Sequence, residues 1–243
     1  MQMTKIEVLY PETCNLFGDM FNIKLLEQSI KDVEIINTKF TDEPAFVTQN
    51  IDMLYLAPMT ERTQEEVIKK LEPYKARLEE LINKNTVMLF TGNAFEILGK
   101  YIENEDGTKV KGLGIMDLYS KRDMMHRYSK MYLGEMEIEK GKKTKILGFK
   151  AQFSMTYGDN QEYYAFETIR GDGINKENKF EGIRLNNCFG TYILGPILVN
   201  NPFFAKYILR LLNVKDTIAF EDIAIENYQR RLEEFENPAT KYE

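Results

Sequence analysis

Apolar and polar residues alternate with two different periods along the first hundred residues. Four short apolar runs predict strands, at residues 5–10, 33–40, 51–58 and 86–90. Between these runs, residues 17–32 and 61–83 have apolar side chains at helical spacing, most clearly around Val67 and Leu71. Pro73 is expected to bend or split the second of these helices. The alternation of strand and helix predicts a parallel sheet with right-handed crossovers.

The second half of the chain has a different pattern. Three stretches resemble strands separated by turns, at residues 143–158, 162–169 and 180–194. No long helix separates them, which predicts antiparallel strands or a small second sheet, and Asp106-Gly107 indicates a hairpin turn. Helices are expected near 202–213 and 219–236. Without a linker or repeat, the chain is expected to form a single domain over residues 1–243.

Composition narrows the class of protein. The chain has 243 residues, of which 43% are hydrophobic and 29% charged, with a net charge of −6. This acidity argues against a nucleic-acid-binding surface. No apolar run approaches the roughly 20 residues needed to span a bilayer, and no signal peptide is visible. Cys14 and Cys188 do not make a disulfide framework, which favours a cytoplasmic protein.

The sequence offers few groups for metal binding or for base catalysis. His126 is the one histidine in the chain. A zinc site with several histidine ligands is therefore excluded, and we expect neither a metal nor a cofactor. His126 lies in the charged stretch DMMHRY, where a surface position is the usual role of a histidine.

Residues 91–99, TGNAFEILG, follow the apolar run that ends at Phe90. They indicate a tight turn followed by a short amphipathic helix. Earlier in the chain, Asp19 is the expected N-terminal cap of the helix at 17–32. Strand, sharp turn and helix is the arrangement that presents a nucleophile above an α/β sheet. Here the turn contains Thr91, Gly92 and Asn93.

Four stretches together resemble a known family. They are LYPETCNLFGD at 9–19, TERTQEE at 60–66, KGLGIMD at 111–117 and FEGIRLNNCFGTYILGPILVNNP at 180–202. In order and spacing the chain resembles class I glutamine amidotransferases of the cobyric acid synthase type. It is most similar to the small glutaminase subunits of bacterial lipid II isoglutaminyl synthases, from about residue 6 to residue 212.

The resemblance implies a three-layer α/β fold with a mostly parallel sheet and a site above the strand ends. In such proteins a cysteine thiolate on the strand–helix turn attacks the glutamine amide. A histidine transfers the proton to ammonia, and backbone N–H groups stabilise the oxyanion. The ammonia passes to a synthetase partner, here expected to be a ligase of the Mur type.

The departures from the family pattern fall on the catalytic positions. The family turn, C-G-G-Y-Q-x-L-G, aligns with GNAFEILG, which places Gly92 at the nucleophile and Glu96 at the glutamine. In GTYILGP, Leu194 occupies the position of the histidine base. The family stretch G-F-E-N-H corresponds to GFKAQ at 148–152, so Lys150 replaces the family glutamate and Gln152 replaces the family histidine. In the opening stretch, family arginine and glycine become Met20 and Phe21.

These substitutions predict an amidotransferase frame without glutaminase activity, acting as a partner subunit or regulator of a ligase. Leu194 is expected to pack against the 91–95 turn and partly fill the old pocket. Glu96 and Lys150 are expected either as an ion pair across that pocket or as solvated surface charges.

Other interpretations remain open at this point. Thr91 would stand at the nucleophile position if the alignment shifted by one residue, and Cys188 or Cys14 would be a displaced nucleophile. The chain would then be an active glutamine amidotransferase that supplies ammonia for cobyric acid or cell-wall peptide amidation. A third reading is a binding module that holds a small metabolite near the 91–95 turn.

Overall fold

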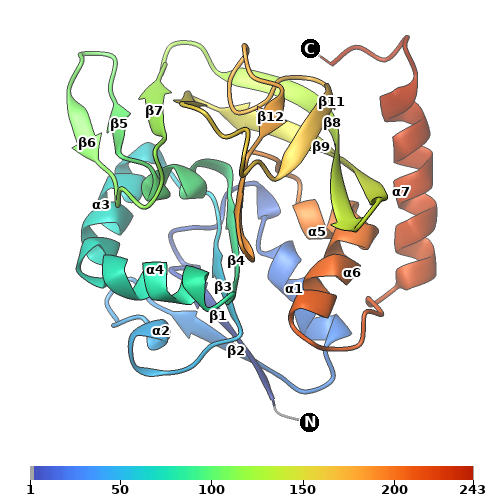
Figure 1. Ribbon diagram of the computed structural model, residues 1–243, viewed down its shortest axis with the longest axis horizontal. Coiled ribbons are helices and arrows are strands. Elements are labelled where there is room, and N and C mark those ends of the chain that lie inside the picture. Colours follow the sequence, from blue (N-terminus) through green and yellow to red (C-terminus); the bar gives the residue numbers. More distant parts are fainter. Residues whose placement is uncertain (1–2, 243) are drawn as a thin grey trace.

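The computed structural model describes residues 3–242 as a central sheet with helices on both faces and two smaller sheets beside it (Figure 1). The central strands are β1 (Thr4–Leu9), β2 (Val33–Thr38), β3 (Met53–Leu56), β4 (Val87–Thr91), β13 (Ile183–Leu185) and β14 (Cys188–Thr191). Their order is β13-β14-β4-β3-β1-β2. Every neighbouring pair is parallel except β13 with β14, so the predicted mostly parallel sheet is confirmed.

The helices occupy the connections between these strands and the C-terminal part of the chain. They are α1 (Phe21–Ser29), α2 (Ala45–Thr48), α3 (Glu61–Leu71), α4 (Lys75–Asn83), α5 (Ile197–Asn200), α6 (Pro202–Leu211) and α7 (Glu221–Glu236). Pro73 lies in the short 3₁₀ helix η2 (Glu72–Tyr74) that separates α3 from α4, as predicted. Asp19 does not cap the start of α1 as expected: Met20 is the residue before α1, and no side chain caps that end. None of the helices within residues 3–242 is long and apolar enough to cross a membrane.

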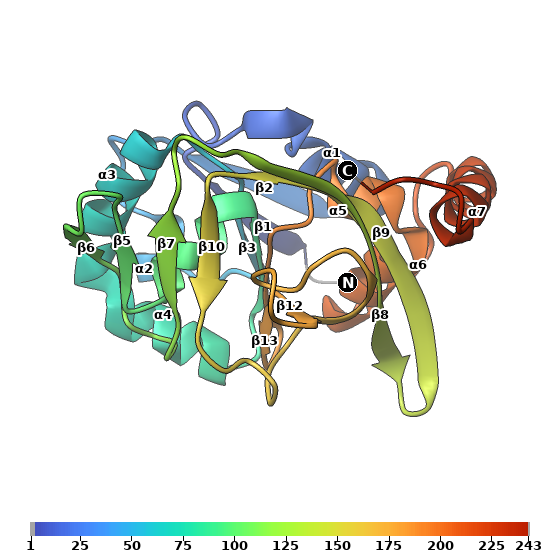
Figure 2. The ribbon, with the colours of Figure 1, turned by 90° about the horizontal axis from the view of Figure 1, so that it is seen from above.

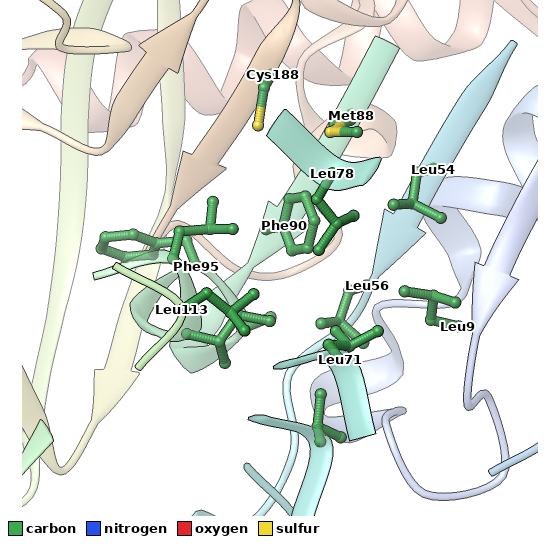
Figure 3. Close-up of a cluster of buried hydrophobic side chains, with 14 of the residues drawn as sticks. Leu9, Leu54, Leu56, Leu71, Leu78, Met88, Phe90, Phe95, Leu113 and Cys188 are labelled. Atoms are coloured by element: carbon green, nitrogen blue, oxygen red, sulfur yellow. The ribbon is translucent and has the colours of Figure 1, made fainter. Parts of the chain in front are cut away.

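Two hydrophobic clusters cover the two faces of the central sheet. On one face, Leu54, Leu56 and Phe90 pack with residues of α3 and α4 (Figure 3). On the other, Tyr55 and Leu89 pack with residues of α1 and α6. Alternate residues of β3 and β4 therefore point to opposite helical layers, which explains why both strands are buried along their whole length.

The second half forms two additional sheets of four strands each, which are seen from above in Figure 2. One contains β5 (Tyr101–Glu103), β6 (Lys109–Lys111), β7 (Tyr119–Arg122) and β10 (Ser154–Tyr157); the other contains β8 (Tyr128–Glu139), β9 (Lys142–Gln152), β11 (Phe166–Arg170) and β12 (Phe180–Glu181). The hairpin expected at Asp106-Gly107 joins β5 to β6. The single strand expected over 143–158 is instead divided at Phe153, where β9 ends and β10 joins another sheet.

Candidate functional site

The turn after β4 has the backbone geometry that the sequence predicts. β4 ends at Thr91, Gly92 has a φ of +58°, and a 3₁₀ helix, η3, runs from Gly92 to Leu98. Since β4 is parallel to both β3 and β14, this turn lies at the carboxyl edge of the sheet, where open α/β sheets bind ligands. The expected short helix is present as a 3₁₀ helix, but it is not amphipathic, because each of its residues except Asn93 is buried.

Gly92 has no space for a side chain. A Cβ atom built on Gly92 would lie 2.7 Å from Cβ of Pro58 and 3.3 Å from Cδ2 of Leu194. Carbon atoms in contact are ordinarily 3.5–4.0 Å apart. Pro58, two residues after β3, and Leu194, three residues after β14, thus both lie where a side chain on Gly92 would project.

The side chain of Asn93 forms hydrogen bonds with Met59, in the connection between β3 and α3. Its Oδ1 accepts a hydrogen bond from the Met59 amide at 3.1 Å, and its Nδ2 donates to the Met59 carbonyl at 2.8 Å. Gln64 Nε2 donates to the carbonyl of Asn93 at 2.7 Å. These bonds hold the turn against Met59, in the connection after β3, and against Gln64 of α3.

Leu194 lies beside the turn, as predicted. Its backbone pairs with Phe149 of β9 through a hydrogen bond from the Leu194 amide to the Phe149 carbonyl at 2.9 Å. The side chain is 1% exposed, and its Cδ2 contacts the region above Gly92. Leu194 has no atom that accepts a proton, so a base is absent from this position.

The Thr91 hydroxyl is buried and already bonded. It donates to Oδ2 of Asp19, and that same oxygen accepts a hydrogen bond from Tyr55 OH at 2.9 Å. Asp19 is 0% exposed, and burial raises the pKa of its carboxyl to about 6. Asp19 therefore ties the opening loop to the ends of β3 and β4, and Thr91 is not free to attack a substrate.

Glu96 is a buried carboxyl and not a surface charge. Its Oε1 accepts hydrogen bonds from Ser154 and from Tyr192 OH, the latter at 2.6 Å, and its Oε2 accepts one from Gln64 at 2.8 Å. Burial raises the pKa of Glu96, while these hydrogen bonds oppose the rise. The expected ion pair with Lys150 is wrong, because Glu96 uses neutral donors from three other segments.

Lys150 forms its ion pair with Glu181. Lys150 Nζ lies 3.4 Å from Glu181 Oε1, and both side chains are almost completely buried, at 1% and 0% exposed. The ammonium also donates to the carbonyls of Asp172 and Gly173 at 2.8 and 2.6 Å. Burial lowers the pKa of Lys150, and the neighbouring carboxylate opposes that change. The alternative of a solvated charge is therefore wrong as well.

Both cysteines are buried, which argues against either one as a displaced nucleophile. Cys188 begins β14 and is paired with Met88, three residues before the pair of Thr191 with Thr91 at the carboxyl edge (Figure 3). Both Cys188 and Cys14 are 0% exposed, and burial raises the pKa of each thiol to about 12. A thiol in such surroundings remains protonated and inert.

Among the described residues, neither Gln152 nor His126 forms a hydrogen bond with residues 91–95. Gln152 is 7% exposed, and its Nε2 donates to the Ser154 carbonyl at 2.7 Å. His126 is on the surface, where its Nδ1 lies 2.9 Å from Asp123 Oδ1. Of two clefts, of about 680 and 580 Å³, neither is lined by Gly92 or Leu194, although Gln152 and Ser154 line the smaller one.

Sequence reasoning missed three residues that shape this region. Asp19 was interpreted as a cap, Pro58 was not singled out, and Glu181 was quoted only within the closing stretch. Each makes its contact with a residue distant in sequence: Thr91, Gly92 and Lys150 respectively. General rules indicate that a buried charge needs a partner and that two backbones in close contact need a small residue. These rules do not identify which distant residue is the partner.

The fold is that of glutamine amidotransferases. A crystal structure of a glutamine amidotransferase from Thermotoga maritima superposes with a TM-score of 0.53 at 10% identity, covering 96% of this chain and 93% of that one. A second glutamine amidotransferase structure gives a TM-score of 0.51 at 12% identity, covering 86% and 99% of the two chains. At sequence identities of 10% and 12%, these two structures show a shared fold and nothing more specific.

Residues 5–202 match the family of CobB/CobQ-like glutamine amidotransferase domains, so the chain belongs to that family. The GatD subunit of lipid II isoglutaminyl synthase (glutamine-hydrolyzing) from Staphylococcus aureus strain N315 is 32% identical over 219 residues, covering 88% of this chain and 86% of that protein. The GatD subunit from Streptococcus pneumoniae strain ATCC BAA-255 / R6 is 25% identical over 198 residues, covering 79% and 74%.

Proposed function

We propose that this chain is an amidotransferase-like subunit that has lost glutaminase activity and serves as a partner or regulator of a ligase. The observation that carries the proposal is the crowding above Gly92, where Pro58 and Leu194 occupy the space that a nucleophile and its base would need. The chain belongs to the amidotransferase family, which supports the fold part of the proposal. Gly92 and Leu194 stand at the positions of the catalytic cysteine and histidine, so the thiol and the imidazole are absent there.

The alternative of an active glutaminase finds no support in the remaining candidate nucleophiles. The Thr91 hydroxyl donates a hydrogen bond to the buried carboxyl of Asp19, and Cys188 is a buried thiol away from the turn. Loss of either the nucleophile or the base typically lowers the rate by a factor of about 10⁴–10⁶. Losing both at one site favours a non-catalytic role.

The names of the relatives suggest the partner. Both GatD proteins are described as subunits of a lipid II isoglutaminyl synthase. We therefore propose that this chain binds a ligase subunit of the Mur type and acts in lipid II amidation in the cytoplasm. Its role there would be to stabilise or regulate the ligase and not to deliver ammonia from glutamine.

Reconstitution tests this proposal. The chain is mixed with the Mur-type ligase of its own organism, and amidation of lipid II is followed with either ammonium chloride or glutamine as the nitrogen source. We expect a stable complex that amidates with ammonium and not with glutamine. The S. aureus GatD protein with its own ligase is the positive control for glutamine. Equal amidation from glutamine would refute the loss of glutaminase activity, and failure to form a complex would refute the partner.

A further inference from the structure

A cleft of about 680 Å³ opens at the amino edge of the central sheet. Its wall includes Thr4 at the start of β1, Asp32 directly before β2 and Asp52 directly before β3. β1 enters the sheet at this edge, at the bottom of Figure 1. Since β1, β2, β3 and β4 are parallel, this cleft and the turn after β4 lie at opposite ends of the strands. It is a separate site, and its use does not depend on whether the turn is active.

Two segments that are distant in sequence form the other walls of the cleft. The end of α1 contributes residues 28–31, and the connection between α6 and α7 contributes residues 212–215 and 217–219. Ser29 Oγ accepts a hydrogen bond from the Ala219 amide at 2.9 Å, which holds the two segments together. The second segment lies outside residues 5–202, so the family match does not cover this wall.

The floor of the cleft is apolar. Ile30, Leu212 and Ile218 line it, and all three are buried members of the cluster that packs α1 and α6 on the sheet. The volume of about 680 Å³ lies within the range of small-molecule sites, about 300–1,000 Å³. Such a floor favours a ligand with an apolar part, because covering it removes apolar surface from water.

Four charged side chains of both signs line the cleft without pairing. They are Lys31, Asp32, Asp52 and Lys215, and none of them forms an ion pair within residues 3–242. Asp52 Oδ2 accepts a hydrogen bond from the Lys5 amide at 2.8 Å, and its Oδ1 has no partner in that range. Two carboxylates and two ammonium groups therefore remain available to a ligand.

Two uncharged features add hydrogen-bonding capacity to the same walls. Thr4 is 6% exposed, and its hydroxyl has no hydrogen-bond partner in the part of the chain that the structure describes. α1 ends at Ser29 with no basic residue in its last turn. The last carbonyl groups of a helix lack partners within the helix and carry a partial negative charge. The end of α1 can therefore accept hydrogen bonds from a ligand's ammonium group.

The mixture of charges selects the class of ligand. A ligand with a single charge would be attracted by two of the four side chains and repelled by the other two. A zwitterion can place each of its charges beside the side chains of opposite sign, and so gains from all four.

We propose that this cleft binds a small zwitterion with an apolar side chain, such as an apolar amino acid or dipeptide. Asp32 and Asp52 hold its ammonium group, Lys31 and Lys215 hold its carboxylate, and its side chain covers the apolar floor. The proposal does not rest on the loss of glutaminase activity, because the cleft and the turn share no residue.

Isothermal titration of the full chain at low ionic strength tests the proposal. The zwitterionic probes are L-phenylalanine and L-alanyl-L-phenylalanine. Phenethylamine, which lacks the carboxylate, and hydrocinnamate, which lacks the amine, are the matched probes with one charge. We expect at least one zwitterion to bind with a dissociation constant of about 1 mM or tighter, and both singly charged probes to bind about tenfold more weakly or worse. A singly charged probe that binds as tightly as the zwitterions would overturn the proposal.

Two variants locate the binding. Asp32→Asn and Lys215→Gln should each weaken the binding of the zwitterion by about fivefold or more, through loss of a charged contact. Both side chains are exposed and unpaired among the described residues, so both variants should keep the wild-type unfolding midpoint.

Asp42→Asn is the matched control, because Asp42 is an exposed carboxylate in the loop after β2, at the other end of the strands. This variant should bind the zwitterion as the wild type does. The proposal fails if neither zwitterion binds at about 10 mM, or if either folded variant of the cleft binds as tightly as the wild type.

Discussion

Replacing Gly92 by alanine adds the single atom that the structure forbids. The new Cβ would lie 2.7 and 3.1 Å from two carbons of Pro58 and 3.3 Å from Leu194 Cδ2. Relieving such overpacking costs about 1–3 kcal/mol. The φ of +58° adds the cost of placing an L-residue in the left-handed region, about 1–2 kcal/mol. We therefore expect Gly92→Ala to lower the free energy of unfolding by about 2–5 kcal/mol, the sum of the two costs.

Urea unfolding of the wild type and the variant measures this difference. Gly107→Ala is the matched control, since Gly107 has a φ of +81° and a Cβ there would have nothing within 4 Å. The control carries the backbone cost without the crowding, so the Gly92 variant should be less stable than the Gly107 variant by about 1–3 kcal/mol. Equal stability of the two variants would show that the space above Gly92 is open, and the explanation for the missing nucleophile would fail.

Three further predictions concern buried ionisable groups. Burial raises the pKa of Asp19 from 3.8 to about 6, so its stabilising effect is complete below pH 3.8 and is lost as pH rises through about 6. The stability of the wild type relative to Asp19→Asn should therefore fall by about 2–3 kcal/mol between these pH values, and a pH-independent difference would contradict the assignment. Lys150→Met should cost about 3–5 kcal/mol in urea unfolding, because it leaves Glu181 buried without its cation, and adding Glu181→Gln should recover much of the loss. Under native conditions an alkylating reagent followed by mass spectrometry should leave Cys188 unmodified, whereas the urea-unfolded chain should react; rapid native labelling would restore a displaced thiol as a candidate nucleophile.

Much of the central sheet could be predicted because its strands are buried on both faces. β3 and β4 are continuous apolar runs, and α3 and α4 have one clear apolar side each. These patterns are local, and they follow directly from the three-layer arrangement. The prediction that Pro73 divides the long helix succeeded for the same reason, since the effect of proline on a helix is local.

The smaller sheets were harder to predict because their limits depend on which strands pair. β8 was not recognised: its charged residues, such as Glu135, face lysines of β9 on an exposed surface, so its pattern is less apolar. The break at Phe153 separates β9, which pairs with β8, from β10, which pairs with β7. Nothing in the local sequence specifies that change of partner.

At the candidate site, the family pattern located the turn but not its surroundings. The placement of Leu194 beside Gly92 followed from the alignment and from the tendency of a leucine to be buried. The partner of Lys150 could not be predicted in this way. Glu181 lies 31 positions further along the chain and is brought close to Lys150 by the sheet that contains β9 and β12. Contacts between distant segments require the tertiary structure.

The release of glutamate from L-glutamine is the most direct test of the central claim. It is measured for the purified chain alone and in complex with its ligase, with the S. aureus GatD protein as the positive control. The account predicts no release above a buffer control in either state, because neither a nucleophile nor a base is present at the β4 turn. Sustained glutamate release that requires the folded chain would contradict it, and loss of that release in a Cys188→Ala or Thr91→Val variant would identify the nucleophile that this account excludes.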